Sequence, residues 1–144
     1  MAENRITVAA PPERVFAVLA DPERYADWVV GTTETHGVGD GWPDPGAKLA
    51  WEAGAGPVTL RDYTEVVESE PPARLLLRAR MRPFGETEIE LLLDPAGDGT
   101  AVTIREQPVE GVAAALHTPV SDAAVSARNA LALRRLKSLV EGAA

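Results

Sequence analysis

Few residues in this sequence have the types and spacing that a catalytic or metal site requires. There is no cysteine, which excludes disulfides, thiolate catalysis and cysteine-based zinc sites. The two histidines, His36 and His117, fall at predicted loop or segment-end positions and are not spaced as metal ligands. No serine lies in a nucleophile elbow, the tight strand-to-helix turn that exposes a catalytic hydroxyl. We therefore predict no metal site and no organic cofactor.

One carboxylate, Glu106, is predicted on the inward face of a strand. Residues 100–107 alternate in character, so that Val102, Ile104 and Glu106 share one face. A carboxylate on that face is costly unless it is paired or hydrated. Glu106 therefore either lines a wet pocket or sits at its open rim. We favour the rim, because we expect the strand to end by Pro108.

One amide, Asn129, is predicted on the apolar face of a C-terminal helix over residues 118–140, where Thr118 suits the cap and Pro119 the first turn. Asn129 is either a buried amide bonded to a strand or to an ordered water, which we favour, or a ligand contact. The weak candidates for catalysis are Glu106, as a proton acceptor, and Asn129, as the group that steadies an enolate. The apolar face that surrounds this amide comprises Val125, Ala132, Leu133, Leu136, Leu139 and Val140.

Proline and glycine divide the rest of the chain into short extended segments, with helical stretches near both ends. Pro11 and Pro12 suit the first turn of a short helix that ends near residue 21, and a second short helix is expected over residues 22–28. The long terminal helix needs a concave partner, and the predicted sheet is the only candidate. This organisation predicts an α+β fold in which a curved antiparallel sheet of six to seven strands wraps around the terminal helix. The expected strands are residues 4–9, 29–35, 48–53, 58–67, 73–81, 86–93 and 100–107.

A hairpin around residues 83–85 shows the clearest alternation, with arginines on the outer face of its first arm and glutamates on that of its second. An exposed ion pair contributes only about 0–1 kcal/mol, so this ladder is expected to set the register rather than to do chemistry. Periodicity leaves open whether Thr64 or Tyr63 points inward from residues 58–67. With a turn centred on Phe84, the predicted cross-strand pairs are Arg82–Glu86, Arg80–Glu88 and Arg78–Glu90, followed by Leu93–Val102 and Leu91–Ile104.

The space between a strongly bent sheet and a single helix is hard to fill, which predicts a concave apolar pocket. Aromatic and aliphatic side chains on the strands, near the hairpin tip and on the terminal helix are the expected lining, although each is individually more often plain core. Tyr63 belongs to this set only if its face of the strand points inward. The predicted ligand-binding residues are Trp51, Tyr63, Met81, Phe84, Glu106, Asn129 and Leu133.

The bulk composition predicts one globular domain over residues 1–144. This length is close to the commonest domain size, and 45% hydrophobic with 25% charged residues is typical of globular rather than disordered chains. The formal net charge of −8 opposes binding to nucleic acid and to anionic membranes. No signal-peptide-like start and no long uninterrupted apolar run are present. We expect a cytoplasmic monomer or weak homodimer without stable membrane insertion.

A resemblance to a known family lies in the segments ITVAAPPERVFAVLADPERYADW, PPARLLL, DPAGDGTAVTI and ARNALALRRLKSLVE. They are similar to the bacterial polyketide cyclase/dehydrase-like group of the START and Bet v 1-like (SRPBCC) superfamily, whose helix-grip fold has the same order of elements. The resemblance implies a cavity between sheet and helix, used by members for lipids, polyketides, isoprenoid quinones and plant hormones. It also places Asn129 where aromatase and cyclase relatives have a polar pocket residue.

Three functions are compatible with these observations. The favoured one is binding, transport or sequestration of a hydrophobic small molecule such as a polyketide, lipid or isoprenoid, which needs only a cavity and a few polar anchors. The second is a cyclase, aromatase or dehydratase that works without metal or organic cofactor. The third is a co-chaperone-like protein-interaction module, which the mixed charge of the predicted outer face supports least.

Overall fold

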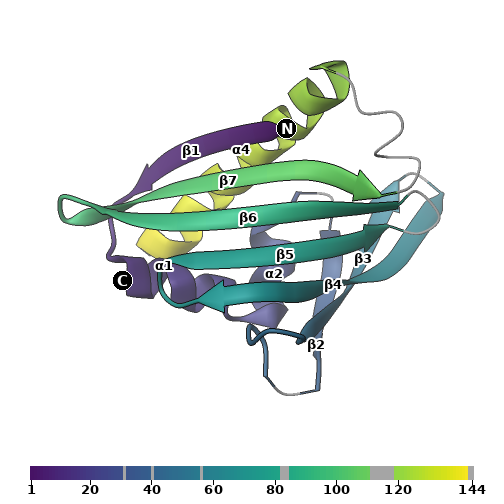
Figure 1. The fold of residues 1–144 in the computed structure, drawn as a ribbon, viewed down its shortest axis with the longest axis horizontal. Coiled ribbons are helices and arrows are strands. Elements are labelled where there is room, and N and C mark those ends of the chain that lie inside the picture. Colours follow the sequence, from purple (N-terminus) through teal and green to yellow (C-terminus); the bar gives the residue numbers. More distant parts are fainter. Residues whose placement is uncertain (31, 40, 56, 82–84, 111–118, 143–144) are drawn as a thin grey trace.

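Seven strands form one antiparallel sheet, in the order β1–β7–β6–β5–β4–β3–β2, within the residues that the structure describes (Figure 1). The computed structural model describes residues 1–30, 32–39, 41–55, 57–81, 85–110 and 119–142, without the side chains of residues 55, 58, 81, 110 and 119–121. The sheet twists strongly, so that β2 and β3 run at a steep angle to β6 and β7 (Figure 1). The strands are β1 (Ala2–Val8), β2 (Thr32–Val38), β3 (Lys48–Ala55), β4 (Val58–Glu70), β5 (Arg74–Met81), β6 (Gly85–Ala96) and β7 (Gly99–Glu110).

The two short helices expected after the first strand are present. Helix α1 spans Pro12–Leu19, and the second is a 3-10 turn, η1 (Pro22–Arg24), that continues into α2 (Tyr25–Trp28). The side chain of Asp21 accepts a hydrogen bond of 3.0 Å from the amide of Glu23, which caps η1. The strand predicted over residues 29–35 begins later, at Thr32, because the amide of Val29 still bonds to Tyr25 and closes α2.

The long helix α4 (Pro119–Gly142) crosses the concave face of the sheet and packs against β1 and β7 (Figure 1). Its predicted apolar face is confirmed at Ala132, Leu133, Leu136 and Val140, all of which are buried. Two polar contacts join it to β1: Lys137 Nζ donates to the carbonyl oxygen of Thr7 at 2.9 Å, and Asn4 Nδ2 donates to Ser126 Oγ at 3.1 Å. Among the described helices, none combines the length and the apolar character that a membrane crossing requires.

The hairpin of β5 and β6 keeps the predicted faces but not the predicted register. Arg80 lies opposite Glu86 and Arg78 opposite Glu88, so the pairing is shifted by two residues from the expected one. The cause is Gly85, which pairs with Met81 and has a φ of 122°, a backbone conformation that other residues rarely adopt. A shift of two residues in the pairing leaves every side chain on its predicted face. The predicted Arg82–Glu86 pair was wrong, because Glu86 pairs with Arg80; residues 82–84 themselves lie outside the described residues.

Strand alternation places the core on the inner faces of β3 to β7. The predicted pairs Leu93–Val102 and Leu91–Ile104 are confirmed. In β4 the buried residues include Thr64 and Val66, which settles the face that periodicity left open. The inward leucines and valines form one cluster with α1, α2 and α4. Its largest fully buried side chains include Leu19, Leu49, Leu75, Leu77, Leu91, Leu93, Leu133 and Leu136.

Gly99, at the start of β7, permits the close approach of β1. A Cβ built there would lie 2.4 Å from the carbonyl oxygen of Val8, and the adjacent Thr100 anchors this region through a 2.7 Å hydrogen bond to the carbonyl oxygen of Ala10. We expect Gly99→Ala to lower the free energy of unfolding by about 1–3 kcal/mol in urea denaturation. The control is Gly54→Ala, whose Cβ would meet its nearest neighbour at an ordinary 3.9 Å. Equal effects of the two variants would contradict the steric explanation.

Candidate functional site

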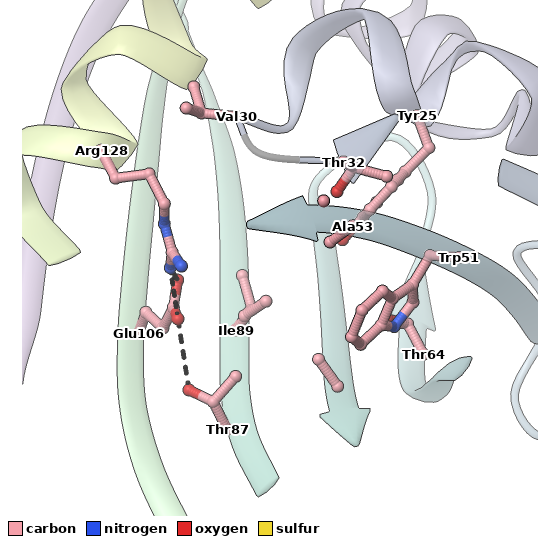
Figure 2. Close-up of a pocket in the computed structure, with 12 residues that line it drawn as sticks. Tyr25, Val30, Thr32, Trp51, Ala53, Thr64, Thr87, Ile89, Glu106 and Arg128 are labelled. Carbon is pink, nitrogen blue, oxygen red and sulfur yellow. Dashed lines mark hydrogen bonds and ion pairs between the residues drawn. The ribbon is translucent and has the colours of Figure 1, made fainter. Parts of the chain in front are cut away.

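A pocket of about 290 Å³ opens between α4, the segment that follows α2, and the inner face of the sheet (Figure 2). It lies beside the core: α4 packs against β1 and β7, whereas the pocket extends to residues of β3 and β4. The strands β3, β4, β5, β6 and β7 each contribute side chains to it. Its lining comprises Tyr25, Val30, Thr32, Trp51, Ala53, Gly54, Thr64, Ala79, Thr87, Ile89, Glu106 and Arg128.

The apolar part of the lining comes from alternate residues of the strands. Trp51 and Ala53 share the inner face of β3 with the buried Leu49, two residues apart each time. Ile89 projects from β6 between Trp51 and the polar side of the pocket, as Figure 2 shows. The expected placement of Trp51 in an apolar hollow therefore agrees with the structure.

Glu106 is buried inside the pocket rather than exposed at its rim. The strand β7 continues past Pro108 to Glu110, so Glu106 does not stand at a strand end, and it is only 5% exposed. Both of its carboxylate oxygens accept hydrogen bonds of 2.7 Å from Nη2 of Arg128 (Figure 2). Asn129 Nδ2 donates to Oε1 at 3.2 Å, and Thr87 Oγ1 lies 3.3 Å from Oε2. The preference for the rim was wrong, because it rested on proline ending the strand.

Arg128 is the charged residue of the pocket lining that sequence reasoning missed. Its side chain is 41% exposed, and it reaches from α4 across the pocket to β7 (Figure 2). On a helical wheel it stands just beyond Leu139, at the edge of the apolar face and about 100° from Asn129, and so looks like an ordinary surface arginine. The signal that could have found it is the inward carboxylate itself, since a buried Glu106 requires a cation within reach.

Tyr25 and Thr64 form a second polar group on another wall of the pocket. Both side chains line the pocket, and each carries a hydroxyl group. Burial, and to a lesser degree the negative charge of Glu106, raises the pKa of the Tyr25 hydroxyl far above its usual value. Tyr25 therefore remains a neutral hydrogen-bond donor. Its ring packs edge-on against Trp28 and Trp42, with ring centroids 5.1 and 6.4 Å away, which fixes its position.

Only some of the predicted ligand-binding residues lie at the pocket. Trp51 and Glu106 line the pocket, and the buried Asn129 lies directly behind Glu106, bonded to a strand residue as favoured. Leu133 is instead part of the core at 1% exposure, away from the pocket lining. Tyr63 lies on the opposite face of β4 from Thr64, where its ring stacks under Lys48 Nζ at 4.8 Å and Arg80 at 5.1 Å. The side chain of Met81 and all of Phe84 lie outside the described residues.

The sequence of this chain matches a known protein family. Residues 2–141 match the family described as polyketide cyclase / dehydrase and lipid transport. The chain belongs to this family. The match spans nearly the whole sequence, so it covers every strand and helix that builds the pocket. The sequence-based resemblance to the polyketide cyclase/dehydrase-like group is thereby confirmed. A comparison with curated proteins gives no match.

Solved structures similar to this polyketide cyclase / dehydrase and lipid transport family member have the same fold. A START superfamily protein from Mycobacterium smegmatis superposes with a TM-score of 0.81 at 14% identity, covering 99% of this chain and 98% of its own. The protein TTHA0849 from Thermus thermophilus has a TM-score of 0.74 at 19% identity, covering 99% and 98%. CalU16 from Micromonospora echinospora has a TM-score of 0.66 at 20% identity, covering 96% and 74%. At these identities the likeness establishes the helix-grip fold alone.

The family and the fold together indicate the kind of ligand that the hollow of this family member accommodates. A helix-grip domain encloses a hollow between its sheet and its long helix, which is a fold for holding hydrophobic ligands. In this chain the hollow combines an apolar side, made by Trp51 and Ile89, with a partly buried ion pair and the hydroxyl groups of Tyr25 and three threonines. The chemistry within reach of a bound molecule is therefore hydrogen bonding from a guanidinium and from hydroxyls.

Proposed function

We propose that this protein binds a small, largely apolar molecule in the pocket beneath α4, as a binder or carrier rather than as an enzyme. The observation that carries the proposal is a cavity of about 290 Å³ whose described walls are mostly apolar and whose charged groups are already paired with each other. An apolar molecule in such a site is stabilised by the burial of its surface, and it does not have to neutralise a charge.

The volume limits the size of the ligand. An engineered cavity of about 150 Å³ accommodates benzene, and ligand pockets for drug-sized molecules range from about 300 to 1,000 Å³. At about 290 Å³, the present pocket suits a molecule of one or two rings, or a short branched chain. A four-ring polyketide or a long acyl chain would require the described walls to move apart.

The contacts of Glu106 favour binding over catalysis. A carboxylate has about four acceptor sites. Arg128 and Asn129 occupy three of them by donating two hydrogen bonds and one, respectively. Thr87 Oγ1 lies near the fourth, at 3.3 Å from Oε2, although the same hydroxyl also donates to the carbonyl oxygen of Gln107, 3.0 Å away. A carboxylate held in this way is poorly placed to take a proton from a substrate, which weakens the cyclase or dehydratase alternative.

Filling the pocket tests this proposal. Ala53 lines the pocket on β3, so Ala53→Phe would place a ring in the space where we expect the ligand to bind. With the two-ring ketone 1-tetralone as probe, we expect the wild-type protein to bind and Ala53→Phe to bind at least about tenfold more weakly in isothermal titration calorimetry. The melting temperature of Ala53→Phe without ligand should be unchanged or higher, because the ring fills a void.

The control variant is Ala50→Phe, which places the same ring on the other face of β3. Ala50 lines a separate surface hollow with His36 and Arg61 and is absent from the pocket lining. This variant should bind 1-tetralone as the wild type does. Equal binding by a well-folded Ala53→Phe would contradict the proposed site, and equal weakening by both variants would show that the effect is not specific to the pocket.

A further inference from the structure

Arg128 keeps hydrogen-bond donors that its partner does not use. A guanidinium has five N–H groups on three nitrogens. Both contacts with Glu106 are made by Nη2, so Nη1 and Nε of Arg128 have no hydrogen-bond partner among the described residues. The side chain lines the pocket and is 41% exposed. A ligand in the pocket can therefore meet N–H donors of Arg128, whose side chain lines the hollow and reaches toward Glu106 (Figure 2).

The same ion pair opposes an anionic ligand. Glu106 already supplies one negative charge to Arg128 at 2.7 Å, so the pair as a whole is neutral. A carboxylate ligand that reached the remaining N–H groups would lie within a few ångströms of the Glu106 oxygens, in a site partly shielded from water. Like charges at such separations repel strongly when the effective dielectric is low. An isolated pocket arginine would favour a carboxylate, whereas this compensated one favours a neutral acceptor.

A second donor lies on another wall of the pocket. The hydroxyl groups of Tyr25 and Thr64 both line the pocket, and burial keeps the Tyr25 hydroxyl protonated by raising its pKa. Each hydroxyl carries a proton that it can donate to an acceptor in the pocket. Between the two polar groups, the apolar surface of Trp51 and Ile89 provides a platform for a ring (Figure 2).

From these contacts we infer that the pocket selects a neutral carbonyl compound of one or two rings, whose oxygen accepts a hydrogen bond from Arg128, and that Glu106 makes the site reject carboxylates. This inference rests on the proposed function, because it assigns a ligand chemistry to the same pocket. Under this inference Arg128 determines specificity by donating to the carbonyl oxygen of the ligand. The negative charge of Glu106 makes the site favour neutral ligands over anionic ones. Fatty acids and aromatic acids are thereby excluded as ligands in favour of ketones and esters.

Three probes that share one two-ring skeleton separate the contribution of the carbonyl oxygen from those of the apolar rings and of a negative charge. These are 1-tetralone, which has a carbonyl oxygen, tetralin, which has no oxygen, and 1,2,3,4-tetrahydro-1-naphthoate, which has a carboxylate. In isothermal titration calorimetry at pH 7 we expect wild-type protein to bind 1-tetralone about tenfold more tightly than tetralin, and the carboxylate most weakly. Binding of none of the three would overturn the proposed function itself. Equal binding of 1-tetralone and tetralin, or tightest binding of the carboxylate, would overturn only the selection.

Two conservative variants identify the residues responsible. Arg128→Lys keeps a cation for Glu106 but loses the planar fork, so its affinity for 1-tetralone should fall to that for tetralin, while tetralin binding is unchanged. Glu106→Gln keeps the shape and removes the negative charge, which should tighten binding of the tetrahydronaphthoate by at least about tenfold because Arg128 is then uncompensated. Unchanged probe preference in either folded variant would contradict the role given to that residue. A variant that does no more than loosen the fold would weaken all three probes together.

Discussion

Arg128→Met is expected to lower the free energy of unfolding by about 2–3 kcal/mol, because it leaves the carboxylate of Glu106 buried without its cation. Breaking a fully buried ion pair from one side typically costs about 3–5 kcal/mol. The expected loss is smaller here, because the Arg128 side chain is 41% exposed and water can approach the carboxylate from that side. Urea denaturation monitored by tryptophan fluorescence measures the change.

The double variant Arg128→Met/Glu106→Leu separates the charge effect from the loss of packing. It removes both members of the pair together, so most of the stability should return. The control Arg135→Met changes an exposed arginine of the same helix, and its effect should be within about 0.5 kcal/mol. If Arg128→Met were as stable as the control, the ion pair would be too well hydrated to organise the pocket.

Leu133→Ala is expected to destabilise the protein by about 3 kcal/mol without changing ligand affinity. Leu133 is 1% exposed in the core cluster between α4 and the sheet, and it does not line the pocket. Large-to-small changes at such positions cost about 2–5 kcal/mol, which for a chain of this size lowers the melting temperature by roughly 10 °C. Thermal unfolding measured by circular dichroism tests the stability, and calorimetric titration with 1-tetralone tests the affinity.

Ser138→Ala, on the exposed side of the same helix, is the matched control and should leave both quantities unchanged. The sequence alone suggested that Leu133 lines the ligand site. In that case Leu133→Ala would weaken the binding of 1-tetralone and change the stability little. A folded Leu133→Ala protein with nearly normal stability and greatly reduced affinity for 1-tetralone would favour the suggestion over the structure.

Hydrophobic alternation predicted much of the fold because it depends only on local periodicity. The inward set of β6 and β7, including Leu91, Leu93 and Val102, follows from a period of two residues, and the buried face of α4 follows from a period of 3.6. The same alternation placed Glu106 on an inner face and Trp51 in the hollow. Proline and glycine located the segment boundaries to within a few residues.

Tertiary contacts determined two features for which the periodicity of the sequence allows more than one arrangement: the inward face of β4 and the register of the β5–β6 hairpin. Both faces of β4 contain apolar and polar residues, so only packing could bury Thr64 and place Tyr63 beneath the outer cations Lys48 and Arg80. A hairpin register shifted by two preserves every face, so the alternation could not distinguish it from the predicted one. Here the backbone conformation of Gly85 selected the register.

The pocket itself was determined partly by sequence and partly by structure. The sequence by itself determined that a carboxylate and an amide, Glu106 and Asn129, face inward from a strand and a helix, because each side chain's direction is set by its own element. Only the tertiary structure decided that Arg128 and Tyr25 complete the site, because the angle and distance between α4, α2 and β7 arise from packing between elements far apart in the chain. Because of that packing, the inward carboxylate of Glu106 is paired with the guanidinium of Arg128, and the pair as a whole is neutral.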